Sequence, residues 1–405
     1  MTRMQPAVVL NHLGRARRVV AFTLAASLLV GCGITDQLKA VPETVVGWFG
    51  SNTKLPELPA FKPEIVVRTR WKADVGGSGN YVMFPLVSDT RVCAASVKGR
   101  VTCLELDSGK ELWTLDLKSP LSAGVGSDGR RLLLVSQNSE LIAIEPDGKL
   151  AFKAQVSGEI LAPPRGAGGL IIIRSTDGRI QGLDGETGKR KWSYQRQLPA
   201  LTIRSQAGVL IDRDRVYAGW PGGKFTALSL DKGTALWEAT VATPKGSTEL
   251  ERIADVISEP VTNGERVCVT AFQGRTMCID RERGQPLWAR DIPSSSAVGF
   301  DFKRGYVSDD KGVIHGLDRA SGASNWAQDA FKGRIPSGPL SYGDYVWFGD
   351  AEGYVHLIDR ANGALASRTQ TDGSQILLAP LQTPAGVLVA TRDGALVMFD
   401  IDAPK

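Results

Sequence analysis

Short apolar runs separated by glycine-containing turns recur along most of the chain. The first turn position of each repeat is a residue that tolerates positive φ, and these positions are Gly99, Asn138, Gly178, Gly223, Gly274, Gly312, Gly353 and Gly394. Ten residues later the first seven repeats carry a second glycine, at Gly109, Gly148, Gly188, Gly233, Gly284, Gly322 and Gly363. Four residues further on stand Trp113, Phe152, Trp192, Trp237, Trp288 and Trp326, with Ser367 in the seventh repeat. Strands and hairpin turns with a period of 38–51 residues predict an all-β fold of the β-propeller type.

The positions of the chain ends predict how the ring closes. Eight hairpin positions are present, but the chain ends before the eighth repeat reaches its aromatic strand. The segment around Trp71 resembles the strands that begin at Trp113 and Trp288, so residues 65–75 are expected to complete the eighth sheet and remove an exposed edge. We therefore predict one eight-bladed β-propeller of four-stranded antiparallel blades over residues 64–405, closed by the N-terminal strand near Trp71.

The N-terminus carries the pattern of an export signal. Arginines precede an apolar stretch at residues 19–30, which is too short to span a membrane as a permanent helix. The stretch ends Leu29-Val30-Gly31-Cys32, which resembles the lipobox of bacterial lipoproteins. The resemblance implies removal of residues 1–31 as a signal peptide and lipidation of Cys32. Gly33 replaces the aspartate associated with inner-membrane retention, which implies the periplasmic face of the outer membrane. An ordinary secretory signal with an incidental cysteine is the alternative.

Residues 32–63 contain several prolines among polar residues, which predicts a flexible tether between the lipidated cysteine and the propeller. The apolar segment at residues 45–49 is expected to pack either on the propeller or at the bilayer surface. The chain has a formal net charge of +5, and residues 1–31 contribute four of its 48 basic residues and no acidic one. The remaining 44 basic and 43 acidic residues give +1, so the mature chain offers no strong charge for nucleic-acid binding.

The remaining cysteines form two pairs with the same offsets from a turn position. The pairs are Cys93 with Cys103, and Cys268 with Cys278. In other repeats these offsets carry a large and a small residue, which indicates that the two positions face each other across a hairpin. In an oxidising periplasm we predict a disulfide in each pair, and buried reduced thiols are the alternative.

The glycine–tryptophan repeats also resemble those of pyrroloquinoline-quinone dehydrogenases, which are eight-bladed. This resemblance offers two alternatives: a quinone-dependent dehydrogenase, or a relict that binds a small ligand in the central channel. The sequence lacks an adjacent cysteine pair to contact the quinone, a Cys-x-x-Cys-His haem site and large inserted loops. After processing only His315 and His356 remain, so no metal site is expected. We expect a non-enzyme without a cofactor. A glycan-binding propeller is a weaker alternative, because no aromatic sugar platform is evident.

Two neighbouring connections between repeats are longer than the others and predict a recognition surface at one edge of the ring. They include Gln197–Arg204 and Thr243–Arg252. The sequences Leu198-Pro-Ala-Leu-Thr-Ile-Arg204-Ser and Gly246-Ser-Thr-Glu-Leu-Glu-Arg-Ile-Ala-Asp255-Val resemble the BamB family of lipoproteins of the outer-membrane β-barrel assembly machinery. The lipobox, tether and eight repeats extend this resemblance over the whole chain.

The resemblance implies a scaffold within the BAM complex that binds the periplasmic POTRA domains of BamA and assists insertion of outer-membrane β-barrel proteins. Contact with nascent outer-membrane proteins is a further expectation. The matching partner-binding positions are Leu201, Ile203, Arg204 and Asp255. The family motif can carry a second aspartate at the position where this chain has Ile257.

The residues themselves leave two arrangements open. Leu201 and Ile203 alternate around Thr202, so an extended segment would present both on one side, or both would pack beneath the long loop. Arg204 and Asp255 occupy equivalent offsets in adjacent repeats, where they could pair with each other or with a partner.

Overall fold

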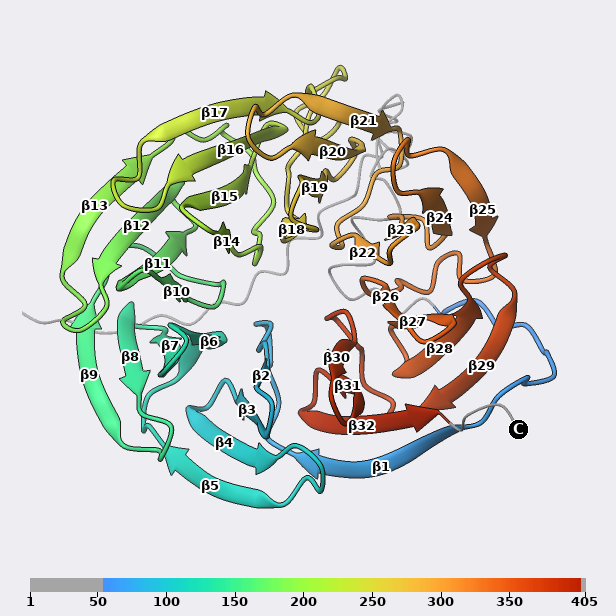
Figure 1. The fold of residues 1–405 in the computed structure, drawn as a ribbon, viewed down its shortest axis with the longest axis horizontal. Coiled ribbons are helices and arrows are strands. Elements are labelled where there is room, and N and C mark those ends of the chain that lie inside the picture. The colour runs from blue at the N-terminus through green and yellow to red at the C-terminus, as the bar shows by residue number, and fades with distance from the viewer. Residues whose placement is uncertain (1–53, 402–405) are drawn as a thin grey trace, which may run out of the picture.

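The structure is a computed structural model that describes residues 54–401. The expected signal peptide, Cys32 and residues 45–49 lie outside this range. The described residues form 32 strands in eight four-stranded antiparallel sheets arranged around a central axis (Figure 1). One parallel bridge between Ser127 and Arg165 joins two neighbouring sheets. The predicted eight-bladed propeller is confirmed. Residues 54–401 contain no helix, and so none long and apolar enough to cross a membrane.

Each sheet has one edge strand near the axis and the other on the outside of the ring (Figure 1). The first four sheets are β2–β5 (Leu86–Val87, Arg91–Ala95, Arg100–Glu105, Glu111–Asp116), β6–β9 (Leu121–Ser127, Leu132–Ser136, Glu140–Ile144, Leu150–Gln155), β10–β13 (Arg165–Ala167, Leu170–Ser175, Arg179–Asp184, Arg190–Gln195) and β14–β17 (Leu210–Asp212, Arg215–Trp220, Lys224–Ser229, Ala235–Thr240). The next three are β18–β21 (Val261–Thr262, Arg266–Thr270, Thr276–Asp280, Pro286–Arg290), β22–β25 (Gly299–Phe300, Arg304–Ser308, Ile314–Asp318, Ser324–Gln328) and β26–β29 (Leu340–Tyr342, Tyr345–Gly349, Tyr354–Asp359, Leu365–Gln370). The eighth combines both ends of the described range: β30 (Leu381–Thr383), β31 (Gly386–Ala390), β32 (Ala395–Ile401) and β1 (Val67–Asp74).

In two sheets, the residue with positive φ in the turn between the second and third strands is not the expected one. Positive φ falls on Ser139 rather than on Asn138, and on Gln273 rather than on Gly274. A Cβ atom at Gly274 would lie 2.6 Å from the Cβ atom of Ala242. Glycine is therefore required at this position by space, and the left-handed conformation is supplied by the neighbouring residue.

The repeated tryptophan and the second glycine form the contact between neighbouring sheets. The ring of Trp288 lies against Gly322 of the next sheet, where a Cβ atom would come within 2.6 Å of the indole. The Trp288 indole N–H also donates a hydrogen bond of 3.1 Å to the carbonyl of Arg319. Five further indole rings pack on a glycine of the next sheet and donate to a carbonyl two or three residues before that glycine. The pairs are Trp71–Gly109, Trp113–Gly148, Trp192–Gly233, Trp237–Gly284 and Trp326–Gly363. The glycines provide both positive φ and room for the ring.

The pairing of β1 with β32 closes the ring. The antiparallel register runs from Val67 opposite Ile401 to Asp74 opposite Ala395. Trp71 is 8% exposed and packs with buried apolar residues of both the first and the eighth sheet, including Leu104 and Leu388. The expected closure by the N-terminal strand is therefore confirmed.

Closure also explains why the seventh repeat has Ser367 in place of an aromatic residue. In its neighbouring sheet the third and fourth strands are the two ends of the described range, so no second glycine turn joins them there. The Ser367 hydroxyl instead donates a hydrogen bond of 3.0 Å to the carbonyl of Ile65. The backbone N–H of Glu64 donates to the carbonyl of Ala366 at 2.8 Å, so the segment before β1 occupies this junction.

Residues 54–66 lie against the sheet β26–β29. The carbonyl of Pro56 accepts a hydrogen bond of 2.6 Å from buried Arg334, and Leu58 packs on the apolar cluster that contains Phe331. The guanidinium of Arg368 lies 5.4 Å from the ring centroid of Phe61. Residues 54–63 of the expected tether therefore contact the propeller in this structure.

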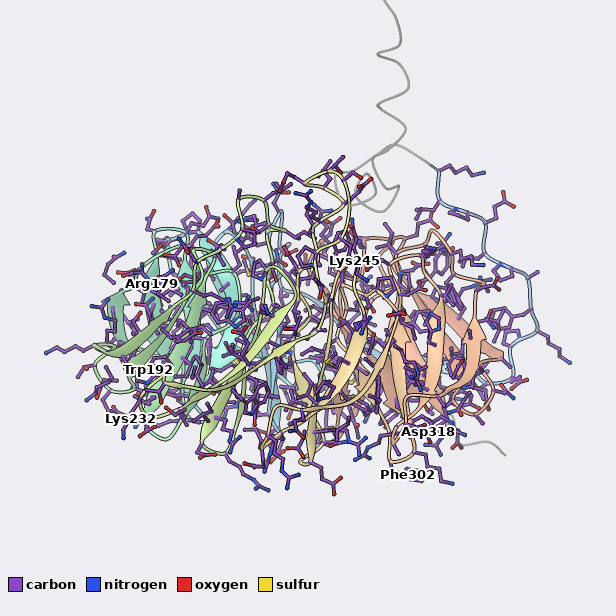
Figure 2. All side chains as sticks on the ribbon, turned by 90° about the horizontal axis from the view of Figure 1, so that it is seen from above. Arg179, Trp192, Lys232, Lys245, Phe302 and Asp318 are labelled. Atoms are coloured by element: carbon purple, nitrogen blue, oxygen red, sulfur yellow. A yellow bond between two sulfur atoms is a disulfide. The ribbon has the colours of Figure 1, made fainter. Side chains whose placement is uncertain are left out.

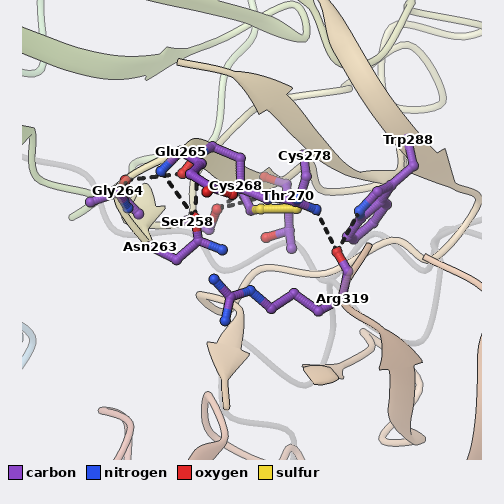
Figure 3. The surroundings of a disulfide bond; sticks show 11 residues. Ser258, Asn263, Gly264, Glu265, Cys268, Thr270, Cys278, Trp288 and Arg319 are labelled. Carbon is purple, nitrogen blue, oxygen red and sulfur yellow. Dashed lines mark hydrogen bonds between the residues drawn. A yellow bond between two sulfur atoms is a disulfide. The ribbon is translucent and has the colours of Figure 1, made fainter. Parts of the chain in front are cut away.

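The structure joins Cys93 to Cys103 and Cys268 to Cys278, and each pair lies directly opposite across a hairpin. All four residues are at most 1% exposed. Figure 3 shows the bridge between Cys268 and Cys278 beside Trp288. Both bridges lie next to a tryptophan contact between sheets.

We predict that Gly322→Ala destabilises the propeller by about 3 kcal/mol, because it combines strain at positive φ with a clash against Trp288. Gly129→Ala is the matched control, since Gly129 also has positive φ but an added Cβ atom would find no other atom within 4 Å. It should cost about 1 kcal/mol. Urea denaturation measures both, and equal losses would contradict the packing role of Gly322.

We predict that both disulfides form in the periplasm. Replacing Cys268 and Cys278 together with serine should lower the free energy of unfolding by about 2–3 kcal/mol, because the bridge closes a short loop with a sequence separation of 10. The Cys93→Ser and Cys103→Ser pair serves as the matched comparison and should give a similar loss. Peptide mapping under non-reducing conditions should recover both cross-links, and free thiols at all four positions would contradict the prediction.

Candidate partner-binding rim

The two long connections predicted from the sequence lie next to each other on one side of the ring. Residues 196–209 connect β13 to β14, and residues 241–260 connect β17 to β18. We call these two connections the rim. Figure 2 shows Lys245, within the second connection, toward the upper side of the disc, whereas Phe302 and Asp318 lie on the lower side.

Asp255 is the residue that joins the two connections. Its carboxylate accepts a hydrogen bond of 2.8 Å from the backbone N–H of Ile203 and one of 3.0 Å from that of Gly222. The side chain is 1% exposed, so it is not presented to a partner on the surface. The expected acidic contact is therefore corrected: both carboxylate oxygens bind backbone groups inside the protein, and Asp255 positions the first connection.

The environment of Asp255 has opposing effects on its ionisation. Burial raises the pKa of its carboxyl group, and the hydrogen bonds from Ile203 and Gly222 lower it without cancelling the effect of burial. No cation pairs with Asp255 among the described residues. The two N–H groups are therefore the main stabilisation of its charge, which ties the ionised form to one conformation of the rim.

Leu201 and Ile203 differ in their exposure. Ile203 packs against the apolar cluster of Ile253, Ile257 and Phe272, whereas Leu201 is 41% exposed. Ile203 therefore packs beneath the long loop, whereas Leu201 is presented on the surface. Ile257 is 7% exposed within the same cluster, so the position that can carry an aspartate in the family motif has an apolar packing role here.

Arg204 does not pair with Asp255. Its guanidinium forms an ion pair of 2.7 Å with Glu159 and lies 5.3 Å from the ring centroid of Tyr81. The hydrogen bond to Glu159 raises the pKa of Arg204, and burial opposes this shift. The side chain remains 48% exposed, so it is accessible on the surface. Tyr81 lies three sheets earlier in the ring, which places Arg204 where several connections meet.

Three residues of this surface were not singled out from the sequence. Glu159 and Tyr81 contact Arg204 from connections that are distant in the sequence, and the stacking of successive sheets brings them together. Leu250 is 42% exposed within the second connection. Its sequence signal is an aliphatic residue in an otherwise polar insertion. Glu251 accepts hydrogen bonds from the N–H groups of Ser247 and Thr248, which shape the turn before Leu250.

The histidines serve separate local contacts. His315 pairs with Asp309 and His356 with Asp350, each at 3.0 Å within one sheet. Burial lowers the pKa of His356, and the hydrogen bond to Asp350 opposes this shift. No group of three or more potential metal-ligating side chains is assembled within residues 54–401.

Comparison with known proteins identifies the family of this rim-bearing propeller. The family model described as outer membrane protein assembly factor BamB matches residues 97–328 and 310–403. The chain belongs to the BamB family. It is 38% identical to the Bordetella pertussis BamB over 85% of this chain and 90% of the relative. It is 36% identical to the Burkholderia pseudomallei BamB over 96% of this chain and 99% of the relative.

Solved structures agree with the fold. The crystal structure of BamB from Moraxella catarrhalis matches with a TM-score of 0.76 and 22% identity, covering 83% of this chain and all of that one. A quinohemoprotein alcohol dehydrogenase from Comamonas testosteroni matches with a TM-score of 0.65 and 13% identity, covering 84% of this chain and 78% of that one. At these identities the likeness concerns the fold alone.

We predict that Asp255→Asn loosens the rim. The asparagine amide has only one acceptor oxygen, so one of the N–H groups of Ile203 and Gly222 loses its partner. Hydrogen exchange at the affected amide should accelerate about tenfold. Asp231→Asn, at a side chain that is 69% exposed, is the control and should leave exchange in the rim unchanged. Unchanged protection at both Ile203 and Gly222 in Asp255→Asn would contradict the positioning role.

Proposed function

We propose that the protein is a non-catalytic scaffold lipoprotein of the outer-membrane β-barrel assembly machinery, anchored through Cys32 to the periplasmic face of the outer membrane. Its similarity to the BamB of Bordetella pertussis supports this role. The proposed activity is positioning: a closed ring holds a protein partner in a fixed orientation. No step of this role requires a reacting group or a cofactor.

We further propose that the rim binds the POTRA domains of BamA. The observation that carries this proposal is a surface of exposed Leu201 and Arg204 on a segment whose backbone is held by buried Asp255. An exposed aliphatic residue beside an accessible arginine suits an apolar anchor with a polar edge. Holding the segment in advance also reduces the conformational entropy that binding must remove.

Ile203 and Asp255 contribute to this binding from inside the protein. Ile203 packs the segment onto the second connection, and Asp255 fixes its backbone. Substitution at either position would weaken binding by displacing Leu201 and Arg204 rather than by removing a direct contact. This distinction separates the four expected partner-binding residues into two that face a partner and two that hold them.

The quinone-dependent dehydrogenase alternative draws on the likeness to the Comamonas testosteroni enzyme, which at 13% identity extends to the fold alone. The four cysteines of the described range lie in cross-strand pairs on two separate sheets, and neither pair is adjacent in sequence. We therefore retain the scaffold role. Dye reduction by the purified protein with added quinone would contradict it.

Direct binding is tested with purified BamA POTRA domains. Arg204→Glu and Leu201→Asp should each raise the dissociation constant for the POTRA domains at least about thirtyfold. Loss of an anchor residue in an interface costs about 2 kcal/mol or more. Arg130→Glu is the charge control, because Arg130 pairs with Glu145 at 2.8 Å as Arg204 pairs with Glu159.

Leu236→Asp is the apolar control, since Leu236 is 46% exposed on an outer strand. Neither control should alter binding. Arg204→Ala separates loss of the contact from repulsion by the introduced carboxylate. Full BamA binding by both Arg204 variants and by Leu201→Asp would overturn the proposed site.

A further inference from the structure

A pocket of about 240 Å³ lies beneath the first connection of the rim, between the sheets β10–β13 and β14–β17. At about 30 Å³ per water molecule it exceeds the space of one or two waters. Its polar lining residues are Arg174, Ser175, Thr176, Thr202, Arg204 and Ser205. Its lining also includes Leu161, Leu198, Ile203 and Trp220. No acidic residue of the described range is among those that line it.

Arg174 is the unusual group in this pocket. It projects from β11, donates a hydrogen bond of 3.1 Å to the carbonyl of Ala207, and lies 5.3 Å from the ring centroid of Trp220. Among the described residues no carboxylate forms an ion pair with it. Arg174 as a whole residue is half-buried, and burial of its guanidinium lowers the pKa of Arg174 to about 10.

The nearby acidic groups have other partners. Glu159 pairs with Arg204 at 2.7 Å, and Asp177 accepts a hydrogen bond from the Ser175 hydroxyl. Arg196 provides an internal comparison, because it also approaches the Trp220 ring, at 6.0 Å, but has the carboxylate of Glu238 at 2.5 Å. Two arginines thus contact one indole, and only Arg196 has an anionic partner.

We propose that this pocket binds a carboxylate group of a peptide segment, with Arg174 as its counter-ion. A buried cation without an anionic partner is costly, so an entering carboxylate gains both Coulomb energy and charge-assisted hydrogen bonds. Thr202 also lines the pocket, and its hydroxyl has no hydrogen-bond partner among the described residues, so it can serve as a second donor. The carboxylate belongs either to an acidic side chain or to the C-terminus of a polypeptide.

The pocket and the rim share Thr202, Ile203 and Arg204. A segment that places a carboxylate in the pocket would therefore extend along the rim. The identity of that segment as part of BamA rests on the proposed function, whereas binding of the carboxylate itself does not. Small carboxylate probes can test carboxylate binding without BamA.

The experiment is an NMR titration of the full mature protein with N-acetyl-aspartate amide, which carries one side-chain carboxylate, and with its neutral counterpart N-acetyl-asparagine amide. Only the aspartate probe should shift the Trp220 indole and Arg174 signals, with a dissociation constant on the order of 1 mM for such a small contact. N-acetyl-alanine and its amide repeat the comparison for a C-terminal carboxylate. The preferred probe identifies the source of the carboxylate.

Arg174→Gln should abolish the response, and Arg174→Lys should retain part of it. Arg196→Gln removes the other arginine near the Trp220 indole, which is paired with Glu238. It should leave the aspartate response within twofold of the wild type. Equal or absent shifts with charged and neutral probes in the wild-type protein would overturn the proposal even if a variant failed to fold. If the wild-type protein responds to the aspartate probe but does not bind BamA, only the proposed function is contradicted.

Discussion

Antiparallel pairing of β1 with β32 is the constraint on which the rest of the structure depends. It brings the two ends of the described range into one sheet and completes the eighth set of four strands. Trp71 then completes the series of indole contacts by packing on Gly109 and donating to the carbonyl of Leu106 at 2.8 Å. Because each sheet is held by both neighbours, closure stabilises every interface in the ring and not only the last one.

The rim is positioned by its contacts with this ring. Its two connections leave adjacent sheets whose separation is fixed, and Asp255 spans the gap with hydrogen bonds to Ile203 and Gly222. Arg204 contacts Glu159 and Tyr81, which reach it from the connections before the third and the first sheet. The exposed Leu201 and Arg204 are therefore surface residues with a defined geometry.

Much of the fold could be predicted from the sequence because its signals are local and repeated. Turn glycines and tryptophans at constant spacing indicate the sheets, and the strand around Trp71 indicates closure. The positive φ of Ser139 could not be predicted, because neighbouring turn residues exchange conformations at small cost. The role of Ser367 also depended on closure, since the absence of a glycine turn in the next sheet becomes visible only when the two ends meet.

The site was less predictable than the fold because its contacts are long-range. The sequence indicated Leu201, Ile203, Arg204 and Asp255 as a group, but burial divides them into exposed and internal residues. The partnership of Arg204 with Glu159 joins residues 45 positions apart. Arg174 gave no sequence signal, because its lack of a carboxylate partner is a property of the assembled pocket.

The central claim is that one face of the closed ring, through the rim, docks the partner. Its most direct test is photo-crosslinking in intact cells, with a photoreactive amino acid replacing Leu201 in one strain and Phe302 in another. Both side chains are exposed, at 41% and 68%, and Phe302 lies on the lower side of the disc (Figure 2). We predict a BamA adduct from position 201 and none from position 302. An adduct from position 302 alone would contradict it.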